Sequence, residues 1–316
     1  MNRDTWNRIR RNARSTVLSP LVRLSIFLCR VLPHSWSHLF FATLGNLAYL
    51  VIPRDRERTL TNLTDIYGDQ YSPRQIRSMA RQVFRNLGHS AADFMIAQSI
   101  TTKEELEEVL SVEGQEHLEK AYRQGRGVVV VTCHLSCFEL LGVYCALRYP
   151  TYIVGARIDD EKLNAILLKS RERLGATNIY KGEANLALFK ALKKGALLGL
   201  LIDQDIKVKS VFVDFFGRPA STPVGPALLA QRTGAVCLGA GIRRIGRKQH
   251  LTFTPEIEIA RTGDTEADLL TNTRRFSEVT ETFIRQAPTQ WVWMHRRWKT
   301  QPGHDEGTGT GAAQGA

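Results

Sequence analysis

Cysteine is scarce in this chain of 316 residues, and its pattern argues against a disulfide-stabilised protein. The five cysteines are odd in number and lie in apolar stretches, which favours buried thiols in a reducing compartment. Cys133, His134 and Cys137 lie close together, but no second Cys/His cluster completes a tetrahedral zinc site, so we expect no metal. Acylation of Cys133 or Cys137 as a covalent nucleophile is a minor alternative.

The sequence also lacks an uninterrupted apolar run of the roughly 20 residues that a membrane-spanning helix needs. The stretch 17–32 is interrupted by Arg23 and Arg30, and the stretch 36–52 contains His38. An amphipathic helix lying in a membrane interface, or one marginal spanning helix, fits these runs, and a pair of core helices packed on a sheet is the alternative. No small-residue cleavage site follows them, so they do not form a secretory signal.

Acidic residues are in the minority, with 31 Asp and Glu against 43 Lys and Arg, which leaves a formal net charge of +12. Such an excess predicts an anionic partner: an acidic lipid, a nucleic acid or an acidic protein. A basic surface module without enzymatic activity is therefore one hypothesis. No nucleic-acid-binding motif of known spacing occurs, and we predict no nucleic-acid partner. Internal repeats and a phosphate-cradling glycine loop are absent as well.

The chain does contain a buried strand that ends in a histidine. Four successive valines between Gly127 and Thr132 predict a strand covered on both faces, because β-branched side chains suit a pleated, covered surface. Ser136 and Glu139 have the spacing of a capping box, which predicts a helix that begins near Ser136. His134 is then expected on the turn between strand and helix.

This turn allows the imidazole of His134 and the carboxylate of Glu139 to meet, whereas residues five apart on one helix point about 140° away from each other. A carboxylate bound to one ring nitrogen leaves the other free to take a proton from a hydroxyl or a thiol. The carboxyl end of a parallel strand is also where α/β proteins bind ligands. In the alternative interpretation, Glu139 only completes the cap and His134 is an ordinary turn residue.

Short apolar strands alternate with helices through the rest of the chain. This order predicts an α/β fold with a mostly parallel central sheet flanked by helices. The stretch 196–202 is expected to be a buried strand that delivers Asp203 to its carboxyl end, and 210–223 to be a hydrophobic loop. The stretch 250–259 alternates as an antiparallel edge strand would. Further strands are predicted at 152–156 and 234–244.

We divide the chain into three parts. Residues 1–53 form a basic N-terminus with membrane-associated hydrophobic helices, 54–302 form the main domain, and 303–316 form a disordered tail of small and polar residues. Within the main domain, Arg171 falls in the last turns of a helix predicted over 161–174, where a cation is favourable.

These residues, taken in order, resemble a known family. His134 and Glu139 look like the His-x4-Asp/Glu motif of the glycerolipid and lysophospholipid acyltransferase superfamily. The wider pattern is similar to the bacterial lipid A biosynthesis acyltransferases, the lauroyl and myristoyl transferases, over about residues 17–302. The other segments that carry the resemblance are Gly125–Gly127, Asp203–Asp205, Val211–Gly217 and Trp293–Lys299.

The resemblance implies O-acyl transfer from an acyl thioester, of acyl carrier protein or of coenzyme A, to a hydroxyl of an anionic membrane glycolipid, a lipid A precursor. In the family pattern, His134 is the general base and Glu139 its orienting carboxylate. Arg171 and Asp203 bind substrate, or Arg171 pairs with Asp203. The reaction requires no metal or redox cofactor.

The resemblance also implies a place for the protein: the cytoplasmic face of a bacterial inner membrane, with the membrane surface as a partner. A phosphatidylinositol mannoside or a lysophospholipid is the alternative acceptor. We expect the aromatic and basic stretch 291–299 either to dock at the lipid headgroups or to form a buried tryptophan cluster.

Overall fold

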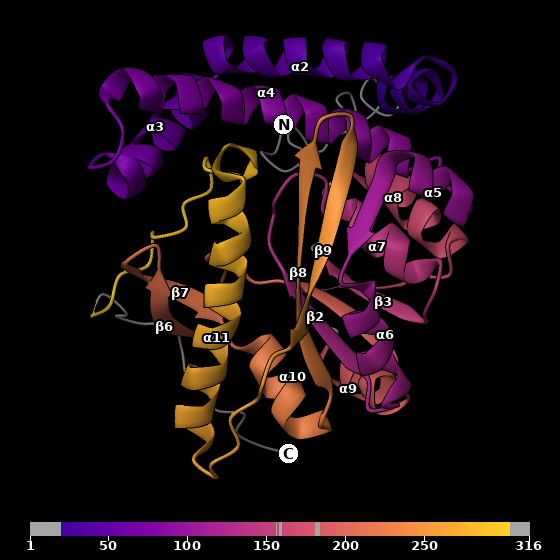
Figure 1. Cartoon of the computed structure of the whole chain (residues 1–316), viewed down its shortest axis with the longest axis vertical. Helices are drawn as coiled ribbons and strands as arrows, with labels where there is room; N and C mark the ends of the chain where they lie inside the picture. The colour runs from indigo at the N-terminus through magenta and orange to yellow at the C-terminus, as the bar shows by residue number, and fades with distance from the viewer. Residues whose placement is uncertain (1–19, 156, 158–159, 181–183, 304–316) are drawn as a thin grey trace, which may run out of the picture.

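The computed structural model describes residues 20–155, 157, 160–180 and 184–303 (Figure 1). Seven strands form one sheet: β1 (Leu110–Glu113), β2 (Val128–Thr132), β3 (Thr151–Gly155), β4 (Thr177–Tyr180), β5 (Leu197–Leu201), β8 (Val236–Ile245) and β9 (Lys248–Glu256). Their order is β1-β9-β8-β2-β5-β3-β4, and every neighbouring pair is parallel except β8 and β9. The mostly parallel α/β sheet predicted from the sequence is therefore confirmed. The predicted basic segment 1–16 and all of the predicted tail but Gly303 lie outside the described residues.

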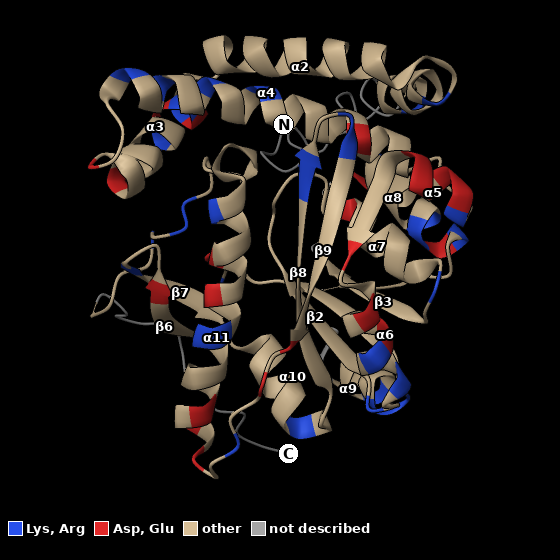
Figure 2. Ribbon diagram, viewed as in Figure 1, with Lys and Arg blue, Asp and Glu red and all other residues tan. Residues whose placement is uncertain are grey.

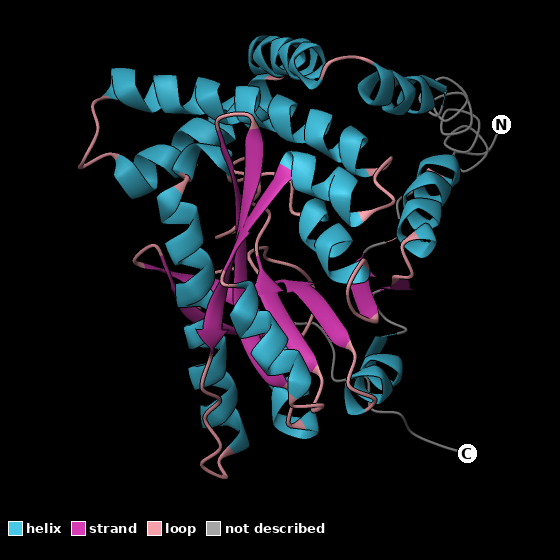
Figure 3. Cartoon of the chain, turned by 45° about the vertical axis from the view of Figure 1, so that its right-hand side comes forward, coloured by secondary structure: helices cyan, strands magenta, loops and turns pink. Residues whose placement is uncertain are grey.

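Helices cover both faces of this sheet (Figure 3). One face is covered by α5 (Lys103–Val109), α6 (Gln115–Arg123), α7 (Glu139–Ala146) and α8 (Glu161–Arg173). The other face is covered by α9 (Ala184–Lys193), α10 (Gly225–Thr233) and α11 (Thr265–Gln286). The four valines of β2 are fully buried, and they alternate between the two cores. Since β2 pairs with β8 on one side and β5 on the other, it is the centre of the sheet, as its valine run predicts.

The hairpin of β8 and β9 extends beyond the rest of the sheet. Only the segment Val236–Gly239 of β8 pairs with β2, and the remainder of the hairpin continues towards the N-terminal helices (Figure 1). β9 is antiparallel to β8, as predicted, but it is not an edge strand, because β1 pairs with its other side. The sequence did not reveal this pairing because β1 is only four residues long.

The stretch 210–223, predicted to be a loop, is instead an antiparallel hairpin of β6 (Ser210–Phe215) and β7 (Arg218–Pro223). Its turn residues Phe216 and Gly217 have φ values of 59° and 76°. Positive φ at both positions is what a two-residue type I′ turn requires. A phenylalanine is unusual in such a turn, so the sequence did not signal a hairpin. The Phe216 N–H donates to Glu281 Oε2 at 2.6 Å, which ties the turn to α11.

The hairpin packs against the tryptophans near the C-terminus. After the short helix η1 (Pro288–Gln290), Trp291 and Trp293 are 1% and 0% exposed and their ring centroids lie 4.8 Å apart. The Phe215 ring lies 5.7 Å from that of Trp291. Of the two interpretations of this stretch, the structure therefore shows the buried tryptophan cluster.

Three further helices form a layer across one end of the molecule: α2 (His34–Val51), α3 (Pro53–Tyr67) and α4 (Pro73–Ala97) (Figure 1). α2 and α4 pack side by side at two glycines. A Cβ on Gly45 would lie 2.2 Å from the Phe84 carbonyl oxygen, and one on Gly88 would lie 2.1 Å from that of Phe41. Only glycine permits so close a backbone approach, so α2 is fixed against α4. The predicted boundary at residue 53 falls at the first residue of α3.

The outer face of α2 is apolar and exposed. This helix contains no Lys, Arg, Asp or Glu, and it is uniformly tan in Figure 2. Across the described ranges, every helix falls short of the length and apolarity that crossing a membrane requires. A contiguous exposed apolar surface of this kind indicates an interaction site. Its exposed side chains include Trp36, Leu39, Phe40, Leu44, Leu47, Leu50 and Val51, continued by Leu21, Leu24, Phe27 and Val31 in the helical residues 20–31 and by Leu32 after them.

Candidate active site

His134 lies on the turn between β2 and α7, where the sequence predicts it, but the turn differs from the prediction. α7 begins at Glu139, and its N-cap Phe138 makes no side-chain cap. Ser136 has a φ of 47°, in the left-handed region, and its hydroxyl donates to Gln249 Oε1 at 3.0 Å. The predicted capping box of Ser136 and Glu139 is therefore wrong, because Ser136 belongs to the turn and its hydroxyl is used by another strand.

The carboxylate of Asp203, directly after β5 and Ile202, holds His134 in place. Its Oδ1 lies 2.8 Å from His134 Nδ1, and its Oδ2 accepts the His134 backbone N–H at 2.8 Å. The indole N–H of Trp291 donates to the same Oδ2 at 2.7 Å. β2 and β5 are parallel neighbours, so their carboxyl ends bring the two side chains together although they are 69 residues apart.

Asp203 is an ionised acceptor. Burial of this side chain would raise its pKa, but the charge and hydrogen bonds of His134 and the hydrogen bond of Trp291 outweigh burial and lower the pKa to about 2. An ionised carboxylate has no proton to give, so His134 Nδ1 is the donor. In the neutral form of the imidazole, the lone pair is then on Nε2, and the His134 side chain is 23% exposed.

Glu139 does not hold His134. Its two carboxylate oxygens accept from Arg171 Nε at 2.7 Å and Arg171 Nη2 at 2.8 Å, a bidentate ion pair. The prediction that Glu139 orients the histidine is corrected accordingly, and so is the alternative that Arg171 pairs with Asp203. The physical reason is that Glu139 is the first residue of α7, where α8 presents Arg171. A third guanidinium hydrogen bond, from Nη1 to Asn178 Oδ1 at 3.1 Å, fixes the arginine.

A cavity of about 300 Å³ lies beside these groups, between the sheet and the helices α7 and α8. His134, Glu139 and Arg171 line it together with apolar side chains, and it follows β5 from Leu197 to Leu201. Gly199, midway along β5, leaves open space where a Cβ would stand. A cavity of about 150 Å³ holds one benzene, so this one has room for roughly a dozen carbons.

A larger cavity of about 1,020 Å³ lies on the opposite face of β5, between α9 and α10. Leu200 and Ile206 belong to the walls of both cavities, so the two adjoin at the carboxyl end of this strand. Leu228 and Leu229 of α10 add to its apolar lining, and Arg232 lies at its edge. The structure thus places apolar space on both sides of the strand that leads to Asp203.

The cysteines near His134 are poor nucleophiles. Cys133 and Cys137 are both buried, and burial raises the pKa of each thiol well above its ordinary value, with Asp203 adding to this at Cys133. Only a thiolate attacks efficiently, so the alternative of a cysteine nucleophile is not supported. No group of three or more His, Cys, Asp or Glu side chains in the described part of the chain is arranged to hold a metal ion.

Sequence reasoning missed the part that the C-terminal segment plays at this site. Trp291 donates to Asp203, and Lys299 Nζ donates to the backbone carbonyl of Asp205 at 2.9 Å. The Asp205 N–H donates to His295 Nε2 at 3.2 Å, and the Thr300 N–H donates to Asp205 Oδ2 at 2.9 Å. The dense run of tryptophans and basic residues was the only signal that this segment closes over the strand ends.

The chain is similar to several known proteins. A family model described as bacterial lipid A biosynthesis acyltransferase matches residues 9–300. The lipid A biosynthesis palmitoleoyltransferase of Escherichia coli (strain K12) is 30% identical over 238 residues, which are 74% of this chain and 75% of the relative. A phosphatidylinositol mannoside acyltransferase of Mycobacterium tuberculosis (strain CDC 1551 / Oshkosh) is 29% identical over 190 residues, 58% of each chain. The crystal structure of the 1-acyl-sn-glycerophosphate acyltransferase PlsC from Thermotoga maritima has a TM-score of 0.39 and 11% identity, covering 82% of this chain and 99% of its own.

The pair of Glu139 and Arg171 generates a stability prediction. Glu139→Gln leaves the buried guanidinium without its counter-charge, so it should lower the free energy of unfolding by about 3 kcal/mol. The double variant Glu139→Gln/Arg171→Met removes both charges and should recover part of that loss. Denaturant unfolding of four proteins measures the coupling: the wild type, Glu139→Gln, Arg171→Met and the double variant. A double variant whose loss equals the sum of the two single losses contradicts a coupled pair.

Proposed function

Because the chain belongs to the bacterial lipid A biosynthesis acyltransferase family, we propose that it moves a fatty acyl chain from an acyl thioester to a hydroxyl of a lipid A precursor, with His134 as general base. The observation that supports this most is the position of His134. Its Nδ1 is bound to Asp203, and its ring lines an apolar cavity of acyl-chain size. A base at the opening of a hydrocarbon site is the arrangement that acyl transfer to a hydroxyl needs.

In the proposed reaction, Nε2 of His134 takes the proton of the acceptor hydroxyl as the oxygen attacks the thioester carbonyl carbon. The tetrahedral oxyanion then collapses, and the carbon–sulfur bond breaks. The imidazolium returns the proton to the departing sulfur, which leaves as a thiol, and the product is an ester. Asp203 stabilises the transient imidazolium and keeps Nδ1 protonated, so that Nε2 remains the base throughout.

Arg171 is the proposed contact for an anionic group of a substrate. Glu139 and Asn178 engage three of its five N–H bonds, which leaves two for a phosphate or a developing oxyanion at the cavity wall. Glu139 then acts by fixing Arg171 rather than His134. A thioester is already activated, so these groups suffice without a metal or redox cofactor.

The net charge of +12 supports acyl carrier protein, an acidic partner, as the donor, although coenzyme A carries the same thioester chemistry. A phosphatidylinositol mannoside is the second candidate acceptor. It rests on the similarity to the mycobacterial phosphatidylinositol mannoside acyltransferase.

We further propose that the exposed face of α2 lies in the interface of a membrane, at the cytoplasmic side of a bacterial inner membrane. The support is the row of exposed apolar side chains on a helix that carries no charge. Arg54 follows directly in the first turn of α3, where it is exposed and suits contact with anionic headgroups.

The reaction is tested by transfer of labelled acyl chains from acyl carrier protein to a tetra-acylated lipid A precursor in detergent. We expect His134→Ala to abolish transfer. Asp203→Asn should lower kcat by about 10²- to 10⁴-fold with little change in KM, because an amide can donate to Nδ1 and place the proton on the wrong nitrogen. Folding of each variant is checked by circular dichroism.

Transfer by the folded His134→Ala protein would exclude His134 as the base. If Asp203→Asn transferred acyl chains at nearly the wild-type rate while Glu139→Gln was inactive, Glu139 rather than Asp203 would orient His134. Transfer to a phosphatidylinositol mannoside but not to the lipid A precursor would select the second acceptor.

The 300 Å³ cavity generates a prediction of chain length. Gly199→Val fills open space along β5, so the preferred acyl chain should shorten by about two to four carbons, given the roughly six carbons that 150 Å³ holds. The matched control is Gly225→Val, which fills open space in the larger cavity and should leave the preference unchanged. Competition among thioesters of different chain lengths measures both. A shift only in the Gly225 variant would assign the donor chain to the larger cavity.

Vesicle flotation tests the membrane contact. Wild-type protein should float with anionic phospholipid vesicles, and Leu39→Glu/Leu47→Glu should remain in the dense fractions because two charges enter the apolar face. Val208→Glu is the control, since Val208 is also exposed but lies near β6, away from α2. Equal flotation of the double variant and the wild type would refute contact through α2.

A further inference from the structure

A chain of buried polar groups runs from the turn that carries His134 to helix α4. The Ser136 hydroxyl donates to Gln249 Oε1 at 3.0 Å, and Gln249 Nε2 donates to Asp93 Oδ2 at 2.6 Å. The other oxygen of Asp93 accepts from the Arg244 guanidinium. The chain therefore joins the turn, the tip of the β8–β9 hairpin and α4.

A second path closes this chain into a ring. The backbone N–H of Arg244 donates to Gln290 Oε1 at 2.7 Å, and Gln290 Nε2 donates to the carbonyl of Arg244 at 3.0 Å. The carbonyl of Gln290 accepts the Ser136 N–H at 3.0 Å. Five residues from the turn, α4, β8, β9 and η1 are thus held in one cycle: Ser136, Gln249, Asp93, Arg244 and Gln290.

Two members of the ring are buried, and the direction of their hydrogen bonds is fixed by chemistry. Gln249 is 0% exposed and Asp93 is 3% exposed. A carboxylate only accepts, so Asp93 orients the amide of Gln249 with its oxygen towards Ser136. Burying a polar group is costly unless it is hydrogen-bonded, so the hydrogen bonds of Gln249 and Asp93 favour this one arrangement.

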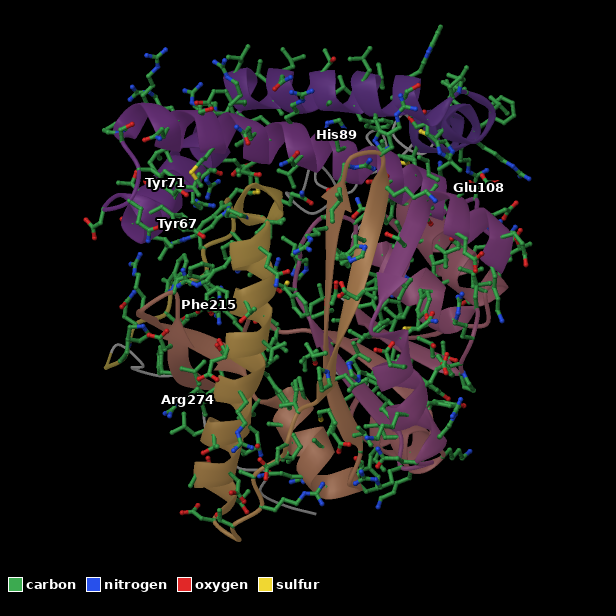
Figure 4. All side chains as sticks on the ribbon, viewed as in Figure 1. Tyr67, Tyr71, His89, Glu108, Phe215 and Arg274 are labelled. Carbon is green, nitrogen blue, oxygen red and sulfur yellow. The ribbon has the colours of Figure 1, made fainter. Side chains whose placement is uncertain are left out.

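The ring also contacts the outer helix of the N-terminal layer. Arg244 Nη2 lies 3.1 Å from His38 Nε2 on α2. Burial and the charge of Arg244 lower the pKa of His38 to about 4. The imidazole of His38 is therefore neutral at pH 7 and accepts from the arginine, although Asp93 Oδ1 is only 3.3 Å from its Nε2. The ring of His89 lies 5.6 Å from that of His38, on the side of α4 that faces the hairpin (Figure 4).

The turn needs such support. Ser136 adopts a left-handed backbone conformation, with a φ of 47°, that residues other than glycine rarely adopt and that persists only when the surroundings impose it. Both hydrogen bonds that Ser136 makes here, from its N–H and from its hydroxyl, go to members of the ring. His134 lies two residues earlier, and Asp203 fixes it from the opposite side.

We propose that this ring positions the general base: Gln249 and Asp93 act through Ser136 to hold the strained turn in the one conformation that aims His134 at the acyl cavity. The inference rests on the proposed function, in which His134 is the base. It makes Gln249 and Asp93 positioning residues that touch neither substrate. It also means that the N-terminal layer is a direct support of the catalytic turn.

The test compares Gln249→Leu, Ser136→Gly and the double variant in the acyl-transfer assay. Each single variant should lower kcat by about 10- to 100-fold, with KM for both substrates within about threefold, because a misplaced base slows chemistry and leaves binding intact. The double variant should be no slower than the slower single one, since both break the same link. Ser136→Gly tolerates the left-handed conformation, so it keeps the test decisive if Gln249→Leu fails to fold.

Ser111→Ala is the matched control. The Ser111 hydroxyl donates to the backbone carbonyl of Gln249 and lies 2.9 Å from His250 Nδ1, so Ser111→Ala removes a contact of Gln249 but leaves every hydrogen bond of the ring in place. This variant should keep the wild-type kcat. An unchanged kcat in folded Gln249→Leu and Ser136→Gly proteins, losses that add in the double variant, or a rise in KM alone would each overturn the proposal.

Hydrogen exchange separates failure of this proposal from failure of the proposed function. Peptides covering residues 132–140 should exchange faster in Gln249→Leu and Ser136→Gly than in the wild type, whether or not the wild type transfers acyl chains. Unchanged exchange in this segment contradicts the ring's positioning role. An inactive wild type with faster exchange in the variants contradicts the reaction but leaves the role in holding the turn.

Discussion

The carboxylate of Asp203 is the interaction on which the site depends. It accepts three hydrogen bonds: two from His134 and one from Trp291. These bonds join the ends of β2 and β5 to the C-terminal segment. They also keep the pKa of Asp203 at about 2 despite its burial, so the acceptor is ionised wherever the protein is folded at ordinary pH. The end of β2, the end of β5 and the C-terminal segment therefore meet at one carboxylate.

The same turn is held from its other side by the N-terminal layer. α2 is fixed on α4 through Gly45 and Gly88. α4 in turn supplies Asp93 to the hydrogen-bonded ring that includes Ser136. The helix with the exposed apolar face is thus connected to the turn that carries His134 through packing and hydrogen bonds. Under the proposed function, the helix proposed to contact lipid is thereby connected to the turn that carries the proposed base.

The sequence predicts much of the fold and several residues of the site, but not which of these residues contact one another. The valine run predicted the central strand, with His134 at its end. The alternation of strands with helices predicted the parallel sheet, with Asp203 at the end of another of its strands. The hydrogen-bond partner of His134 could not be predicted from the sequence. Glu139 is close to it along the chain, whereas Asp203, 69 residues away, reaches it only because the sheet places the two strand ends side by side. The β6–β7 hairpin was missed because Phe216 occupies a turn position where the sequence signal is usually asparagine.

The central claim, that Asp203 sets the protonation of His134, is tested most directly by nitrogen NMR of the ring. Long-range ¹H–¹⁵N spectra of ¹⁵N-histidine-labelled protein, with His134→Gln to identify the signal, report which ring nitrogen carries the proton. At pH 8 we expect a protonated Nδ1 and an unprotonated Nε2 in the wild type, and loss of this pattern in Asp203→Asn. A proton on Nε2 in the wild type, or an unchanged pattern in Asp203→Asn, would contradict it.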